Sequence, residues 1–599
     1  MPGVSPQQAA PASSSTTSAK SPLRDSLPLL ITVVAGIACY GLFWNRGLGL
    51  SVIGYSIAPA ERVMQGEVPY RDFLFNYTPG ILWVNALLMK MFGATLLTTR
   101  VGLLIFKLAT LVVLFIIGRR LTNRWIALLP VGLTLAWLGH QQIFNVYPDQ
   151  YLILCALAAL ICMLKYNERD ASGWLLTCGL LVGSVFLFKY NVGVLLLGSG
   201  GVSILFRESL VTRSWKAIVS KLGIYLIGFG VVAVSLVAYL AINHALGAMI
   251  SHFIHHAAEY SETRSVTLPP ARLILPAILV YVAAIACGVV IFWQAPRLFV
   301  VFLIAVFLII PVILFVPSGT GSLSESAVAS VAYFPPAIFG LALIPALWRL
   351  KRKGSAASQF WIEEGSLVIT GLFAVAVYLE VFPRADFYHL VRVLPPVFLF
   401  FVALGFRLVP NINGKLEERL PTANQAVAFL LTAVPLLFLV IAGVKDTWVP
   451  EFDSALRFRD NHQLNIERGQ GILVEERQAQ LTEGLVELIQ ANSAPDDYVF
   501  SFAQRGSALY FLAARRNPTK FLWWRSVGIS SEERDAVMNM VTNRRAKLIV
   551  VQDVAATQEI QDFIGDNYDQ IGAVADIAVY GLKDRRAAGS DAEQSKPSF

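Results

Sequence analysis

The chain has 599 residues, of which only 15% are charged and 56% are hydrophobic. Soluble globular proteins carry about 25% charged residues, so this composition excludes an ordinary soluble enzyme and indicates a polytopic membrane protein. The formal net charge of +8 does not indicate nucleic-acid binding, because the basic residues lie beside apolar runs, as membrane topology requires.

Residues 1–25 are rich in Ser, Pro, Ala and Thr and have no apolar period, which predicts a disordered cytoplasmic tail. The apolar runs that follow provide about thirteen membrane-spanning helices. Basic residues concentrate in alternate connections, including 119–124 and 349–353, which places the N-terminus in the cytoplasm and the C-terminus outside. The predicted spans begin near residues 27, 98, 126, 150, 173, 191, 218, 273, 298, 330, 365, 391 and 424.

The first external loop, at about residues 45–97, is long for a membrane protein, and loops of this length usually carry function. Its segment 80–93, GILWVNALLMKMFG, is apolar but too short to cross a bilayer, which predicts an interfacial or re-entrant helix. Tyr77, Trp83 and Tyr388 fit the aromatic belt at the membrane surface. The charged residues of the loop include Glu61, Arg62, Glu67, Arg71 and Asp72.

Ionisable groups also occur in later external segments, where they are functional candidates because burying a charge without a partner is costly. Asp149 lies in FNVYPDQY and Lys189 lies at an external helix end in FLFKYNVG. The segment VFPRADFYHLVRVLPP contains Arg384, Asp386, His389 and Arg392.

A group of histidines in ISHFIHHAAEY has the spacing of one helix face. That face could bind a divalent metal or an anionic ligand. The alternative is an amphipathic helix whose polar face meets water at the membrane surface. The residues are His252, His255, His256 and Glu259.

After Val444 the composition becomes that of a soluble protein, and short β-branched runs alternate with helix-like stretches. This pattern predicts a small extracytoplasmic α/β domain at residues 445–585, followed by a polar tail at 586–599. Residues 26–444 form the predicted transmembrane domain.

The run from Pro69 to Leu121, with a Pro-containing loop, a short helix ending in Phe-Gly and a long apolar span ending in GRRL, resembles membrane glycosyltransferases of the GT-C class. The chain is similar to the lipid A aminoarabinose transferases, the protein O-mannosyltransferases and bacterial family 39-like enzymes. Further similarity lies in GLLVGSVFLFKYNVG and in HLVRVLPP. The resemblance implies a GT-C-like fold and transfer of a sugar from a polyprenyl-phosphate-linked donor on the extracytoplasmic face.

For such chemistry, basic groups would bind the donor phosphate and a carboxylate would take the proton of the acceptor. Lys189, Arg384, Arg392 and His389 are the candidates for phosphate binding, with Arg62, Arg71 and Asp386 as further site candidates. The early acidic residue of the family is absent, since Val52 and Ile53 stand near its position. The candidate catalytic carboxylates are Asp72, Glu61 and Asp149, where Asp149 resembles the family's second acidic site.

Three alternatives stay open. Asp72 could instead close a turn at the Pro69–Arg71 corner. The chain could bind a lipid-linked sugar as an assembly subunit without transferring it, or it could transport a lipid or sugar. The resemblance implies a bacterial inner (cytoplasmic) membrane location, a lipid donor, and a glycan, lipid or protein acceptor; a divalent metal is the candidate cofactor.

Overall fold

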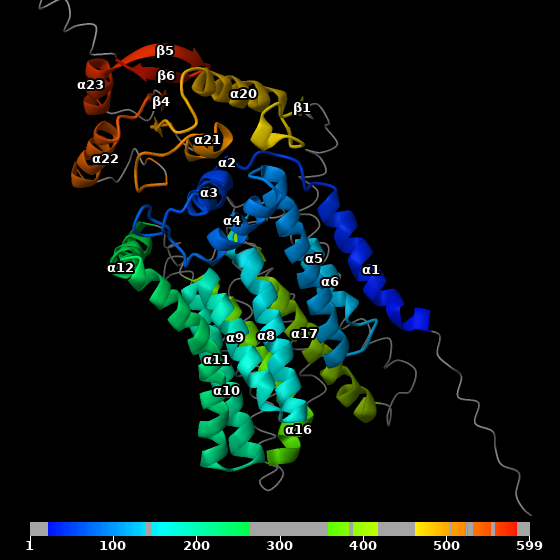
Figure 1. The fold of residues 1–599 in the computed structure, drawn as a ribbon. Coiled ribbons are helices and arrows are strands. Elements are labelled where there is room, and N and C mark those ends of the chain that lie inside the picture. The colour runs from blue at the N-terminus through cyan, green and yellow to red at the C-terminus, as the bar shows by residue number, and fades with distance from the viewer. Residues whose placement is uncertain are drawn as a thin grey trace, which may run out of the picture.

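Figure 1 shows the computed structural model of the protein. It describes residues 22–137, 146–263, 357–382, 387–416, 462–503, 506–522, 524, 531–552 and 558–583. The predicted spans near 273, 298, 330 and 424, the predicted domain boundary after residue 444 and most of both predicted tails lie outside these residues.

Five helices in the described part of the chain are long and apolar enough to cross a membrane, and four shorter apolar helices accompany them. A helix lies in or directly beside each of the other nine predicted starts. The prediction of a polytopic helical membrane protein is therefore confirmed, while the number thirteen stays a prediction. The long helices are Leu96–Leu121, Pro148–Arg169, Tyr190–Val211, Trp215–Ile242 and Ser358–Val381.

The helices of the membrane domain follow in chain order. They are α1 (Pro22–Gly41), α4 (Gly80–Phe92), α5 (Leu96–Leu121), α6 (Leu128–Trp137), α8 (Pro148–Arg169), α9 (Ser172–Phe188), α10 (Tyr190–Val211), α11 (Trp215–Ile242), α12 (Leu246–Thr263), α16 (Ala357–Tyr378), the 3-10 turn η3 (Leu379–Val381) and α17 (Phe387–Leu416). Between α1 and α4 lie α2 (Leu50–Val52), the π-helix η1 (Ile53–Ile57) and α3 (Ala58–Met64).

Local sequence signals set several helix ends. The Thr95 side chain accepts a hydrogen bond from the Thr98 amide, which caps the start of α5. Proline at the first position begins α8, and Asp170 in the left-handed conformation ends it. Lys189 alone separates α9 from α10, because its extended backbone (φ −147°, ψ 112°) interrupts the helix.

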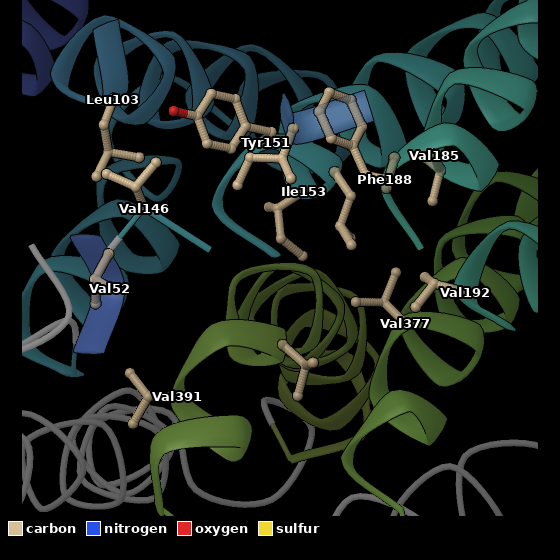
Figure 2. Packing of buried hydrophobic residues seen from close by; sticks show 14 of the residues in the cluster. Val52, Leu103, Val146, Tyr151, Ile153, Val185, Phe188, Val192, Val377 and Val391 are labelled. Carbon is tan, nitrogen blue, oxygen red and sulfur yellow. The ribbon is translucent and has the colours of Figure 1, made fainter. Parts of the chain in front are cut away.

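Helices α9 and α11 pack closely against each other. Helices α9 and α11 meet where Gly179 and Gly228 face each other, and a Cβ at either glycine would lie within 2.3 Å of a backbone oxygen of the other helix. Small residues permit such approach between membrane helices. Figure 2 shows part of the buried apolar core of the bundle, with Val185 of α9, Val192 of α10 and Val377 of α16 close together.

The predicted C-terminal α/β fold is confirmed. A four-stranded sheet has the order β3-β4-β6-β5, in which β3 and β4 are parallel and the other pairs are antiparallel. Helices α22 and α23 pack on an apolar cluster at one face, and α20 contacts β5. The elements are β1 (His462–Gln463), η5 (Glu467–Gly469), β2 (Leu473–Val474), α20 (Glu476–Ala491), β3 (Val499–Ser501), α21 (Ser507–Leu512), α22 (Ser531–Asn543), β4 (Leu548–Gln552), α23 (Gln558–Asn567), β5 (Tyr568–Val574) and β6 (Ile577–Leu582).

The C-terminal domain rests on the long loop at residues 45–97, which was predicted to be external, at one end of the helical bundle (Figure 1). The amide of Gly47 donates to the Leu473 carbonyl over 2.8 Å, and the amide of Leu473 donates to Asn45 over the same distance. Further along, the Leu74 amide donates to the Lys520 carbonyl over 2.8 Å. Hydrogen bonds between main chains therefore join the two parts at the start and in the middle of the loop.

Candidate functional site

Four charged side chains from separate segments meet at the end of the helical bundle that carries the C-terminal domain. Asp149 lies in the first turn of α8, Lys189 lies between α9 and α10, Glu380 lies in η3, and Arg392 lies in α17. We call these four residues the ion cluster. The helix start at Pro148 and the break at Lys189 direct the chain so that both side chains reach the same place.

The ion cluster is held by short charge pairs. Lys189 Nζ lies 2.6 Å from Asp149 Oδ1, and Arg392 Nη1 lies 2.9 Å from Asp149 Oδ2. Lys189 also pairs with Glu380. The side chains are 1–6% exposed, so the pairs lie in a low dielectric where their mutual attraction is strong.

Aromatic rings support the two cations. Lys189 Nζ lies 4.8 Å from the centre of the Tyr77 ring, and Arg392 Cζ lies 4.3 Å from that of Tyr147. Cations over aromatic faces are attracted by the ring quadrupole. Tyr77, which was predicted for the aromatic belt, thus has its ring against a buried lysine, and its place in that belt stays a prediction.

An apolar layer adjoins the ion cluster. Tyr151 follows Asp149 by two residues, and its ring stacks on Phe188, the residue before Lys189, with centroids 5.7 Å apart (Figure 2). Phe106 of α5 lies against Tyr151 at 4.6 Å. The Tyr151 hydroxyl donates to Asn85 of α4 over 3.3 Å. These contacts tie the two segments that carry Asp149 and Lys189 into the core.

Two further ionisable residues lie near the ion cluster. His389 of α17 interacts electrostatically with Asp149 and Glu380. Lys107 lies inside the long span α5, is 3% exposed, interacts electrostatically with Arg392 and lies 5.3 Å from the centre of the Tyr40 ring. Both place a further ionisable group beside the four paired residues.

Asp72 lies in the long loop at residues 45–97 and has a different set of partners. Its carboxylate accepts from the Val68 amide over 2.7 Å and from the Arg71 guanidinium over 2.8 and 3.0 Å. The Arg71 hydrogen bonds lower the pKa of the Asp72 carboxyl, and the backbone hydrogen bond acts in the same direction. Asp72 thus closes the loop corner, where Tyr70 has a φ of 69°, and its lowered pKa makes it a weak base.

Glu61 and Arg62 face the C-terminal domain. Glu61 pairs with Arg468 over 2.6 Å, and Arg62 donates to the Thr519 carbonyl over 3.0 Å. Arg62 also pairs with Glu67 over 2.7 Å and donates to the Asp72 carbonyl over 3.1 Å. Burial raises the pKa of the Glu61 carboxyl, and Arg468 only partly offsets that effect.

The opposite pKa shifts of these two carboxyls predict opposite pH dependences. Asp72 has a lowered folded-state pKa, so it stabilises the fold above the unfolded pKa of about 3.9 and loses that contribution as pH falls. Glu61 has a raised folded-state pKa. The fold therefore loses stability as pH rises from the unfolded pKa of about 4.3 through the higher folded-state pKa.

We expect Asp72→Asn to lower stability at pH 7 by less than about 1 kcal/mol and to have less effect below pH ~4. We expect Glu61→Gln, relative to the wild type, to gain stability between pH ~4 and pH 7. Thermal unfolding in detergent across this pH range measures both differences. Parallel curves for either variant and the wild type would contradict the assignment for that residue.

The histidine group is only partly described. His252 Nε2 lies 3.0 Å from Asn76 Oδ1, and His255 Nδ1 contacts the Ser251 carbonyl over 2.7 Å. Among the described residues, no three His, Cys, Asp or Glu side chains form a group that could hold a metal. The side chains of His256 and Glu259, and both Arg384 and Asp386, lie outside the described residues.

The structure therefore brings together Asp149, Lys189 and Arg392 with His389 beside them, and it places Asp72, Glu61, Arg62 and Arg71 in the loop that contacts the C-terminal domain. Sequence reasoning missed Glu380 and Lys107. Both stand within or at the end of apolar runs, VAVYLEVF and LLIFKLAT, and an ionisable residue in such a run is itself a functional signal.

Comparisons with known proteins show which family and which fold the chain resembles. Residues 76–242 match the family model described as dolichyl-phosphate-mannose-protein mannosyltransferase, which confirms the predicted resemblance. This stretch includes Tyr77, Asp149 and Lys189. No curated protein matches the chain.

Three solved structures are similar to the chain. The chain is similar to ArnT from Cupriavidus metallidurans bound to undecaprenyl phosphate, with 16% identity and a TM-score of 0.51, over 93% of this chain and 98% of that one. The apo form of the same protein gives 14% identity and a TM-score of 0.50, over 96% and 98%. An Archaeoglobus fulgidus oligosaccharyltransferase in complex with zinc and sulfate gives 11% and 0.45, over 93% and 73%. The ArnT likeness shows that the chain has an ArnT-like fold.

Proposed function

We propose that this protein, with its ArnT-like fold and its match to the mannosyltransferase family model, is an integral membrane glycosyltransferase. It moves a sugar from a polyprenyl-phosphate-linked donor to an acceptor hydroxyl on the extracytoplasmic face of the bacterial inner membrane. The ion cluster is the observation that supports this proposal. Its two buried cations, Lys189 and Arg392, lie at the end of the helices, where they could bind a lipid phosphate.

The charges suit a phosphodiester. Lys189 and Arg392 are paired with Asp149 and Glu380. The phosphate of a polyprenyl-phosphate sugar carries one negative charge, which can pair with either cation. Charge-assisted hydrogen bonds from Lys189 and Arg392 would bind its oxygens.

The same groups support the chemistry. The acceptor oxygen attacks the anomeric carbon, the bond from that carbon to the phosphate oxygen breaks, and the electron pair leaves with the polyprenyl phosphate. Lys189 and Arg392 stabilise the charge that develops on the leaving phosphate. As they turn to the phosphate, Asp149 loses part of its pairing and accepts the proton of the acceptor hydroxyl.

This assignment prefers Asp149 to the two loop carboxylates as the base. Asp72 is bound by Arg71 and by a backbone amide, contacts that hold it at the loop corner. Glu61 is covered by Arg468 of the C-terminal domain. Both loop residues have contacts that fit a structural role, whereas Asp149 lies between the two cations.

The test is transfer by the purified protein in proteoliposomes. Radiolabelled undecaprenyl-phosphate mannose, glucose, galactose and 4-amino-4-deoxyarabinose are supplied together with a cell-envelope fraction as acceptor, and release of undecaprenyl phosphate is measured. We expect wild-type transfer from one of these donors, and a loss of about 100-fold or more in Lys189→Met, the size of effect seen when one group that stabilises a transition-state charge is removed.

Lys221→Met is the matched control, because Lys221 also pairs with an aspartate, Asp170, but through a 3.3 Å contact elsewhere in the fold. It should transfer at nearly the wild-type rate. Full activity of Lys189→Met would contradict the proposed site. Donor binding without release would favour the non-catalytic assembly subunit, and movement of the lipid across the bilayer without transfer would favour the transporter.

A further inference from the structure

Three tyrosines from distant parts of the chain gather beside the ion cluster. Tyr55, Tyr77 and Tyr147 form what we call the tyrosine triad. The ring of Tyr55 lies 5.8 Å from that of Tyr77, nearly perpendicular to it, and 5.8 Å from that of Tyr147. The ring centroid of Phe75 lies 5.5 Å from that of Tyr55.

The triad differs from the ion cluster in exposure. All three tyrosines are partly exposed, whereas the four charged side chains are buried. Tyr77 and Tyr147 each contact one of the two cations, and Tyr55 contacts both of these rings. The triad therefore joins partly exposed rings to the buried charges.

The backbone at Tyr55 is unusual. Residues 53–57 form a π-helix, η1, between α2 and α3. π-Helical turns are rare in proteins, and those that occur are often found at functional sites. Their wider turn displaces side chains from the positions that they would have in an α-helix. Here the π-helix brings Tyr55 into contact with Tyr77 and Tyr147, which lie outside it in the sequence.

The chemistry of the triad suits a sugar ring. A pyranose has an apolar face of C–H groups that stacks on aromatic rings and a rim of hydroxyls that require hydrogen-bond partners, and tyrosine offers both surfaces. The Tyr55 phenol interacts with that of Tyr77. Burial raises the pKa of Tyr55 well above its ordinary value, so the phenol stays protonated and acts as a donor rather than as a base.

We propose that the tyrosine triad is the subsite for the transferred sugar and that Tyr55 contacts the sugar ring directly. The inference rests on the proposed function, since it places the sugar next to the cations that bind the donor phosphate. A polyprenyl tail fits this place less well, because phenol hydroxyls beside buried charges form a polar surface.

Direct binding measurements separate the sugar from the phosphate. The full-length protein in detergent is titrated with radiolabelled undecaprenyl phosphate and with the mannose, glucose, galactose and 4-amino-4-deoxyarabinose derivatives of that lipid. We expect the wild type to bind at least one sugar derivative about tenfold more tightly than the bare lipid. In Tyr55→Ala this ratio should fall to about one, while the Kd for the bare lipid is unchanged.

Tyr55→Phe keeps the ring and removes the hydroxyl, and it should lower the ratio at least threefold without altering the fold. Tyr498→Ala, in the C-terminal domain, is the control and should keep the wild-type ratio. Equal binding of the bare lipid and all four derivatives by the wild type, or an unchanged ratio in Tyr55→Phe, would overturn the inference. Failure of the wild type to bind even the bare lipid would instead contradict the proposed function.

Discussion

Replacing Asp149 by asparagine is expected to lower the free energy of unfolding by about 3 to 5 kcal/mol, because it leaves buried cations without their shared counter-charge. Asp149 is 1% exposed and pairs with both Lys189 and Arg392. After the change, Glu380 is the one acidic partner left to the pair among the residues that the structure describes. The loss is measured by reversible unfolding in mixed micelles with increasing concentrations of sodium dodecyl sulfate.

The matched control is Asp170→Asn. Asp170 also pairs with two cations, Arg207 and Lys221, but its side chain is 55% exposed. Exposed pairs contribute about 0–1 kcal/mol, so this variant should remain close to the wild type. Similar losses in both variants would show that burial of Asp149 does not determine its contribution.

A double variant tests the pairing itself. Asp149→Asn combined with Lys189→Met should cost less than the sum of the two single changes, because residues in one ion network do not contribute additively. Additive losses would mean that the two side chains do not interact in the folded protein.

The second large effect is expected at Gly54, where the π-helix η1 meets α21 of the C-terminal domain. A Cβ at Gly54 would lie 1.9 Å from Ser507 Oγ, 2.7 Å from Ser507 Cβ and 3.2 Å from the Ala508 amide nitrogen. Rotation of the serine side chain cannot relieve all three contacts. Gly54→Val should therefore separate the two elements and destabilise their contact by roughly 1 to 3 kcal/mol, as overpacking does.

Hydrogen exchange reports this separation. In Gly54→Val, the amides of Gly47, Leu74 and Leu473, which form the hydrogen bonds between the loop and the domain, should exchange faster than in the wild type. Ser507→Gly removes the two closest atoms and should partly restore protection in the double variant. Gly41→Ala is the control, since no atom lies within 4 Å of its added Cβ. Unchanged exchange in Gly54→Val would show that the contact does not hold the domain.

Much of the membrane fold could be predicted from the sequence, since apolar length and charge-poor runs are local properties. The helix break at Lys189 and the helix start before Asp149 are local as well, and both residues were predicted as site candidates. Their convergence with Arg392 depends on the packing of α8, α9 and α17. The packing of these helices cannot be predicted from the local pattern of a single sequence.

The roles of the loop carboxylates depend on contacts that are even more remote in sequence. Glu61 and Asp72 were candidate bases because they lie in a long external loop, yet Glu61 pairs with Arg468, about 400 residues later. Sequence spacing does not reveal that the C-terminal domain covers this loop. The π-helix at Tyr55 was not predicted either, because the stretch IGYSI has no local pattern that distinguishes a π-turn from an α-turn.

The most direct test of the central claim is a cryo-electron-microscopy structure of the protein in nanodiscs with undecaprenyl phosphate. We expect the phosphate oxygens within hydrogen-bond distance of Lys189 Nζ and of the Arg392 guanidinium, with the pairing of at least one of these cations to Asp149 loosened. A phosphate bound at another place, with the Lys189–Asp149 and Arg392–Asp149 pairs unchanged, would contradict the claim that the ion cluster binds the lipid donor.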